Sequence, residues 1–122
     1  MDSKALICVV DDDADVRVSL DDLLRASDYR VACFDDAESF LGSVERGDCT
    51  CVVADIHMPG LSGIDLARQV VAMEDAPKVI LITGRLEAAW RERAMNSGAS
   101  GFMRKPIEAK SLIDMIEEGA AA

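Results

Sequence analysis

Polar side chains that could bind a metal ion and a phosphoryl group follow four apolar stretches of this 122-residue sequence. Neighbouring carboxylates repel one another unless a cation lies between them, and oxygen donors of this kind suit Mg²⁺. A lysine and a hydroxyl beside such an ion can neutralise a phosphoryl group and donate hydrogen bonds to it. The residues concerned are Asp11, Asp12, Asp13, Asp55, Thr83 and Lys105.

Asp55 is the carboxylate best placed to act as a nucleophile. It stands alone between the apolar residues 52–54 and the turn at Pro59 and Gly60. A carboxylate can attack phosphorus directly and form an aspartyl phosphate. Taken singly, each residue of the set has a simpler explanation: an acidic turn that caps a helix, the end of a strand, or a surface charge. The phosphoryl hypothesis therefore depends on whether the fold brings these residues together.

Five short apolar stretches alternate with amphipathic stretches, and this pattern predicts five strands, each followed by a helix. The strands are expected at residues 5–10, 31–34, 51–54, 79–82 and 99–103. Strands and helices that alternate at this spacing predict an α/β fold, a parallel sheet with helices on both faces. Ligand sites in such sheets lie outside the carboxyl ends of the strands. We therefore expect the polar residues to meet at one edge of the sheet.

The helix boundaries carry their own signals. Asp35, paired with Glu38, is expected to cap the second helix, on which Val44 faces inward. Ser62 is expected to open the third helix, and residues 86–96 are expected to form the fourth.

The composition predicts one acidic, globular domain that spans residues 1–122, with residues 119–122 as a chain end or a linker. A net charge of −10 disfavours direct binding to DNA, RNA or anionic lipid, although residues 85–105 carry a local positive excess. No apolar stretch has the length of a signal peptide or a membrane span, so a cytoplasmic location is expected. The cysteines lack the pattern of a zinc site and are expected to act mainly as small buried side chains.

Four motifs resemble those of one family, the receiver domains of two-component response regulators. They are VVDD at Val9–Asp12, D-x-x-M-P-G at Asp55–Gly60, ITG at Ile82–Gly84, and Lys105–Pro106. The resemblance covers the whole chain, with the motifs in order. It implies a doubly wound, flavodoxin-like sheet of five parallel strands in the order 2-1-3-4-5, with five helices.

The resemblance also implies a role for each acidic residue. Asp55 resembles the phosphoacceptor, Asp12 a direct Mg²⁺ ligand, and Asp11 a ligand that acts through water. His57 would supply its backbone carbonyl to the metal, while its side chain is expected to face solvent. His57 and Arg85 stand at positions that influence how long the phosphoryl group persists.

The remaining roles concern the phosphoryl group and the response to it. Thr83 would donate a hydrogen bond to a phosphoryl oxygen, and Lys105 would pair with the phosphoryl charge. Phe102 stands where the family keeps an aromatic residue that turns inward when Thr83 moves. The bond before Pro106 is expected to be cis.

The implied function is a signalling switch and not an enzyme that acts on other molecules. A histidine kinase or a phosphotransfer protein would deliver the phosphoryl group to Asp55, and the domain would assist its own phosphorylation and dephosphorylation. The face formed by the fourth helix, the fifth strand and the fifth helix would then form a homodimer or contact an output partner. The ITG motif with Phe102 weakly resembles receivers joined to a helix-turn-helix domain, so control of transcription is expected.

Three alternatives remain open. The first is a stand-alone domain that shuttles phosphoryl groups. The second is a small phosphohydrolase with an aspartyl phosphate intermediate, although Ala14 and Asp15 break the D-x-D-x-[TV] pattern that would start at Asp11. The third is an adaptor domain with an inactive site.

Overall fold

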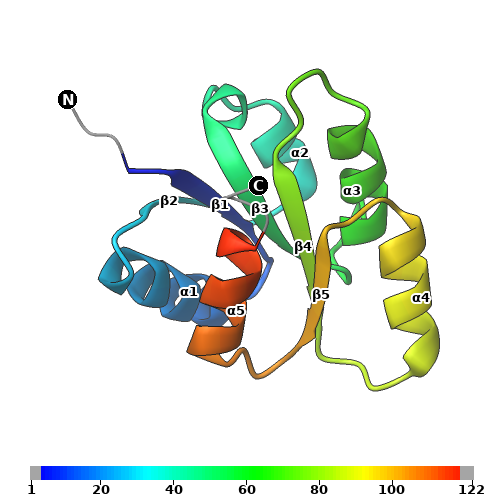
Figure 1. Ribbon diagram of the computed structural model, residues 1–122. Helices are drawn as coiled ribbons and strands as arrows, with labels where there is room; N and C mark the ends of the chain where they lie inside the picture. Colours follow the sequence, from blue (N-terminus) through cyan, green and yellow to red (C-terminus); the bar gives the residue numbers. More distant parts are fainter. Residues whose placement is uncertain (1–3, 119–122) are drawn as a thin grey trace.

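The computed structural model of the protein describes residues 4–118, in which a five-stranded parallel sheet lies between two layers of helices (Figure 1). The strands are β1 (Leu6–Val10), β2 (Arg30–Phe34), β3 (Cys49–Asp55), β4 (Lys78–Thr83) and β5 (Gly101–Arg104). The α-helices are α1 (Ala14–Ala26), α2 (Ala37–Leu41), α3 (Gly63–Val71), α4 (Ala88–Asn96) and α5 (Ala109–Glu117). A short 3-10 helix, η1 (Glu45–Gly47), precedes β3.

β1 is an interior strand of the sheet, and its apolar side chains are all buried. It pairs in parallel with β2 on one side and with β3 on the other. β4 and β5 extend the sheet beyond β3, which gives the order 2-1-3-4-5. This order and the five α-helices confirm the predicted doubly wound, flavodoxin-like fold. Because all five strands run in one direction, their carboxyl ends lie at the same edge.

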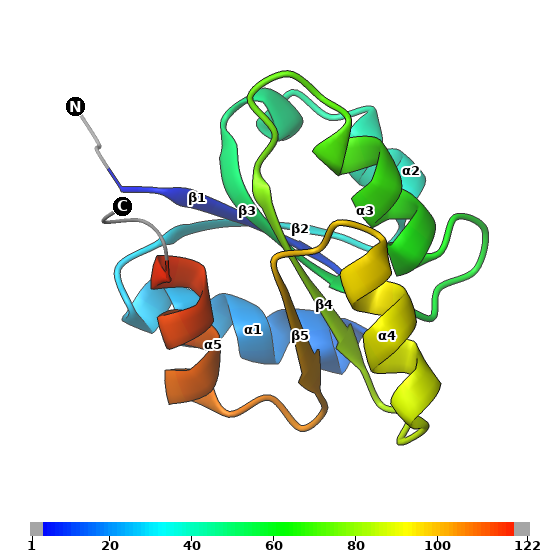
Figure 2. The same cartoon turned by 45° about the vertical axis from the view of Figure 1, so that its right-hand side comes forward.

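Each face of the sheet has its own apolar core. α1 and α5 cover one face, and α2, α3 and α4 cover the other (Figure 2). Neighbouring side chains of β1 point to opposite faces: Ile7 and Val9 pack toward α1 and α5, and Cys8 and Val10 toward the other helices. Burial on both faces holds the central strands firmly, so the residues at their ends occupy fixed positions.

Two details of the second helix differ from the prediction. Asp36, and not Asp35, caps α2, because its side chain accepts a hydrogen bond from the backbone N–H of Ser39 at 2.7 Å. α2 ends at Leu41, so Val44 lies beyond the helix and is 89% exposed instead of facing inward. Both errors arise because α2 has only five residues, which is too short for a helical pattern to mark where the helix begins and ends.

Other boundaries also shift. Ser62 caps α3 as predicted, but α4 begins at Ala88 and leaves Leu86 exposed in the preceding loop. β5 begins at Gly101, later than the expected residue 99, and includes Arg104. Residues 119–122, expected to be a chain end or linker, lie outside the described residues.

Cys8 and Cys51 are buried, as expected for cysteines in apolar stretches, and Cys49 is buried too. Cys33, which lies in the apolar stretch 31–34, is exposed and corrects the expectation. All four are free thiols. Within residues 4–118, no helix combines the length and the apolar character needed to cross a bilayer.

Candidate functional site

The polar residues singled out in the sequence lie at the carboxyl edge of the sheet. Asp11 and Asp12 directly follow β1, and Asp55 and Thr83 are the last residues of β3 and β4. Lys105 directly follows β5. Four strands that are separate in sequence therefore deliver their polar residues to one place, because a parallel sheet aligns their ends.

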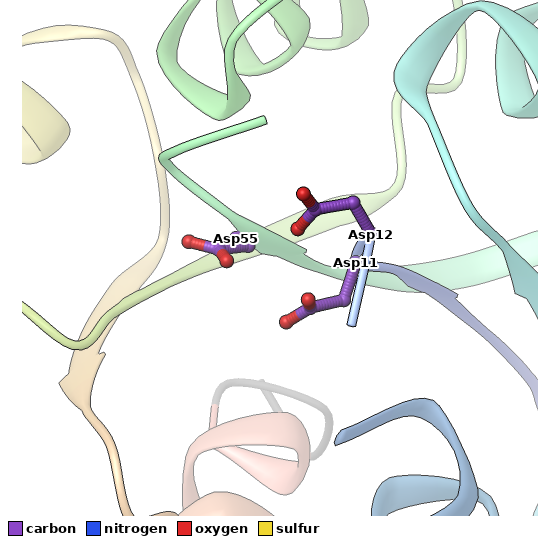
Figure 3. Close-up of side chains that lie close together, drawn as sticks. All are labelled: Asp11, Asp12 and Asp55. Carbon is purple, nitrogen blue, oxygen red and sulfur yellow. The ribbon is translucent and has the colours of Figure 1, made fainter. Parts of the chain in front are cut away.

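Asp11, Asp12 and Asp55 form a carboxylate cluster. Each offers one oxygen, and these oxygens lie within 4.8 Å of one another. Figure 3 shows the three side chains projecting from the ends of β1 and β3 into the same space. Asp11 is fully buried and Asp55 is 5% exposed, whereas Asp12 is exposed. The cluster thus joins two buried carboxylates to one that solvent reaches.

Lys105 forms ion pairs with both buried carboxylates. Its Nζ donates a hydrogen bond to Asp55 Oδ2 at 3.0 Å and lies 3.2 Å from Asp11 Oδ2. Burial lowers the pKa of Lys105, but the bond to Asp55 and the charge of Asp11 outweigh it, so the pKa is raised overall. The backbone N–H of Lys105 donates to the carbonyl of Thr83 at 2.8 Å, and the Lys105–Pro106 bond is cis as expected.

The donor set fits a hard divalent cation. Asp11 Oδ1 accepts the backbone N–H of Asp13, but Oδ2 is buried and receives no hydrogen bond within residues 4–118, although it faces Lys105. Burial raises the pKa of Asp11, and the nearby charge of Asp55 raises it further. A buried carboxylate oxygen that is held by an ion pair alone, beside two further carboxylates, is in an environment that a second cation stabilises.

The side chain of His57 lies inside the site, which corrects the expectation that it faces solvent. Its Nε2 is 2.9 Å from Thr83 Oγ1, and its backbone N–H donates to Asp55 Oδ1 at 3.0 Å. Burial and the charge of Arg85 lower the pKa of His57, which favours the neutral imidazole. The sequence holds no signal for this orientation, because Thr83 is 26 residues away.

A cleft of about 400 Å³ lies beside His57 on the α4 side of the site. Trp90 of α4 meets the His57 ring edge-on, with ring centroids 4.5 Å apart and planes at 90°. The guanidinium of Arg93 stacks over the Trp90 ring at 4.5 Å, and that of Arg85 lies 5.9 Å from it. The carboxylate site is therefore in contact with α4 through His57.

Phe102 of β5 is half-buried and packs against the core that includes α4. It lies beside Arg91, Met103 and Arg104 around a shallow surface hollow. Arg104 donates to the carbonyl of Leu86 at 3.0 Å and so ties β5 to the loop before α4.

Gly63, the first residue of α3, is a site residue that sequence reasoning missed. A Cβ at this position would overlap the carbonyl oxygen of Asp55 and would lie 2.8 Å from the Cα of Ile56. Its backbone N–H donates to the carbonyl of Ile56 at 3.0 Å. Only glycine lets α3 begin so close to the backbone that carries Asp55. The available signal was a glycine directly after the capping Ser62, where most helices place a larger residue.

Comparisons with known proteins agree with this geometry. A sequence model of the response regulator receiver domain matches residues 7–117. The chain is 39% identical over 117 residues to the transcriptional regulatory protein FixJ of Bradyrhizobium diazoefficiens, and this match covers 96% of the chain and 57% of FixJ. It is 33% identical over 115 residues to the response regulator protein TodT of Pseudomonas putida, covering 94% of the chain and 51% of TodT.

Solved structures give the same result. The response regulator StyR is 40% identical, with a TM-score of 0.84, and the match covers 96% of this chain and 59% of StyR. The chain thus spans about half the length of the relatives it matches. Because the family model matches residues 7–117 and the sheet has the order 2-1-3-4-5, the chain belongs to the response regulator receiver domain family.

Proposed function

We propose that Asp55 is the phosphoacceptor of this receiver domain and takes its phosphoryl group from a histidine kinase or a phosphotransfer protein. The observation that carries the proposal is the placement of Lys105, whose Nζ lies within 3.2 Å of both Asp55 and Asp11 at the end of the sheet. Such a cation beside a carboxylate nucleophile holds the negative charge of an incoming phosphoryl group.

The side chains around Asp55 account for each part of the phosphoryl transfer. One carboxylate oxygen of Asp55 forms the new O–P bond as the P–N bond of the phosphohistidine breaks, and the histidine leaves with the bonding electrons. Lys105 pairs with the phosphoryl oxygens, and the Thr83 hydroxyl donates to one of them. The backbone N–H of His57 orients the carboxylate through its bond to Oδ1.

We assign the metal to the carboxylate cluster. Asp12 and Asp55 would hold Mg²⁺ directly, Asp11 would hold it through water, and His57 would contribute its backbone carbonyl. When bound, Mg²⁺ supplies positive charge for the phosphoryl oxygens. The unbonded Oδ2 of Asp11 and the solvent access of Asp12 support this assignment.

The output is proposed to be control of transcription. FixJ is a transcriptional regulatory protein, and the chain covers 57% of its length. We propose that phosphorylation remodels the face of α4, β5 and α5 around Phe102, which then forms a homodimer or contacts an output partner. A single-domain phosphoryl shuttle is the second candidate.

The test is the transfer of labelled phosphoryl groups to D55N. A phosphorylated histidine kinase or a small phosphoramidate donor labels the wild-type protein in the presence of Mg²⁺, and D55N takes up no label. D22N, which alters an exposed acid on α1, serves as the matched control and is labelled at the wild-type rate. Labelling of D55N at that rate would refute the proposal. Release of many phosphates per protein from simple esters would instead favour a phosphohydrolase.

A further inference from the structure

The Thr83 hydroxyl already has two partners in this structure. Thr83 is completely buried, and its Oγ1 accepts the backbone N–H of Arg85 at 3.0 Å. His57 Nε2 lies 2.9 Å from the same oxygen. A threonine hydroxyl has one hydrogen to donate. If that hydrogen is donated to His57, it is not available to an oxygen of a phosphoryl group on Asp55.

His57 also has a second contact, on the side away from Thr83. Its ring lies edge-on against Trp90, and Arg93 stacks on the same Trp90 ring. Trp90 is half-buried and belongs to α4, on the face that packs against the sheet. A continuous set of contacts therefore runs from Thr83 through His57 to α4, and it does not pass through Phe102.

We propose that His57 is a positioning residue that holds the Thr83 hydroxyl in the unphosphorylated state. When that hydroxyl is released, the His57 ring shifts and alters its contact with Trp90. In the resting protein Thr83 donates its hydrogen to His57 Nε2. A phosphoryl group on Asp55 competes for that hydrogen, and the imidazole loses its partner when Thr83 turns away. The inference rests on the proposed role of Asp55 and adds a second route to α4.

Two substitutions of His57 separate the hydrogen bond from the ring. H57F keeps an aromatic ring against Trp90 but removes the acceptor for Thr83. H57Q removes the ring but places a polar side-chain atom about as far from the backbone as Nε2. It therefore gives the Thr83 hydroxyl a hydrogen-bond partner again. R93A is the matched control, because it changes the contact on Trp90 without touching Thr83.

The first measurement is the affinity for beryllium trifluoride, a phosphoryl mimic, at saturating Mg²⁺. Because H57F no longer holds Thr83 in the resting position, it is expected to bind the mimic about 2- to 10-fold more tightly than wild type, the effect of one hydrogen bond. H57Q is expected to return the affinity toward the wild-type value, and R93A to retain it. Equal affinities for wild type and H57F would overturn the proposal.

The second measurement is tryptophan fluorescence, since Trp90 is the single tryptophan of the chain. The mimic is expected to change the emission of wild type, and this change is expected to fall to less than half in H57F. An equal change in H57F would show that His57 does not pass the signal to Trp90. Labelling of the wild-type protein, measured in parallel, separates the role of His57 from that of Asp55. If Asp55 takes up label and H57F behaves as the wild type in both measurements, only the role of His57 is refuted. If the wild type takes up no label, the proposed function is refuted.

Discussion

At the scale of single residues, the site places two buried carboxylates and one exposed carboxylate within 4.8 Å of one another. Mutual repulsion and the loss of water make this costly, and Lys105 offsets only part of that cost. The raised pKa of Asp11, caused first by burial and then by Asp55, is a direct sign of this residual cost. The arrangement is therefore less stable than an apolar one would be, and function is the reason to keep it.

Loss of Lys105 is expected to weaken both the stability and the chemistry of this site. K105M leaves Asp11 and Asp55 facing one another without a cation, so the free energy of unfolding at pH 7 without Mg²⁺ is expected to fall by about 1–3 kcal/mol, less than a fully buried pair would lose. Phosphorylation of Asp55 is expected to slow on the order of 100-fold. Urea unfolding and label uptake measure the two effects.

K110M is the control for that experiment. Lys110 forms an exposed ion pair with Asp114 on α5 and is expected to show neither effect. If K105M unfolded and took up label as the wild type does, Lys105 would have no part in the site.

The positions of most site residues could be predicted from the sequence, but the orientation of one side chain could not. The positions of Asp11, Asp55, Thr83 and Lys105 follow from their places after apolar stretches, because a parallel sheet aligns strand ends. The orientation of His57 does not follow, since its rotamer is set by Thr83 and by Trp90, which come from separate elements. A side chain held by two distant partners leaves no local pattern.

At the scale of secondary structure, the strands buried on both faces were the easiest to predict. β1 and β4 are continuous apolar stretches, and their predicted and observed ranges nearly coincide. α2 was harder because two adjacent acids, Asp35 and Asp36, could equally cap it by residue type, and only the backbone conformation distinguishes them. The close packing of a helix start against a strand, such as that of Gly63 against Asp55 of β3, leaves no signal in a periodic pattern.

Gly63 provides a prediction at this scale. G63A places a Cβ against the backbone of Asp55 and Ile56, which cannot move aside as a flexible side chain would. The first turn of α3 must shift, so we expect a loss of about 1–3 kcal/mol in the free energy of unfolding. We also expect slower phosphorylation of Asp55.

The matched control is G47A. A Cβ at Gly47 would meet no atom within 4 Å, so the free energy of unfolding is expected to change by less than about 0.5 kcal/mol. Equal stability of G63A and G47A in urea unfolding would show that α3 can retreat from β3 without cost.

At the scale of the whole molecule, one sheet separates two cores and carries the site at its edge. Binding a cation there stabilises only the folded chain. At a Mg²⁺ concentration ten times the dissociation constant, the gain is about 1.4 kcal/mol, which for a domain of this size corresponds to about 5 °C in Tm. Thermal unfolding with Mg²⁺ and with EDTA measures this difference.

Two variants of neighbouring acids make the measurement specific. D12N removes one member of the carboxylate cluster and is expected to lose most of the response to Mg²⁺. D13N alters the adjacent acid, which caps α1 and lies outside the cluster, and is expected to keep the response. An equal response in both variants would place the cation elsewhere.

The backbone of Thr83 is fastened to the neighbouring strand, and this restricts how a signal can leave the site. Thr83 pairs in register with Arg104, and its carbonyl accepts the N–H of Lys105. Displacing this backbone would drag Lys105 away from Asp55, so the available motion is rotation about the Cα–Cβ bond. A β-branched side chain rotates between discrete staggered wells and does not rest between them. The response of Thr83 is consequently discrete: in each molecule its side chain occupies one staggered rotamer or another. A graded response can arise only from the fractions of molecules in each rotamer.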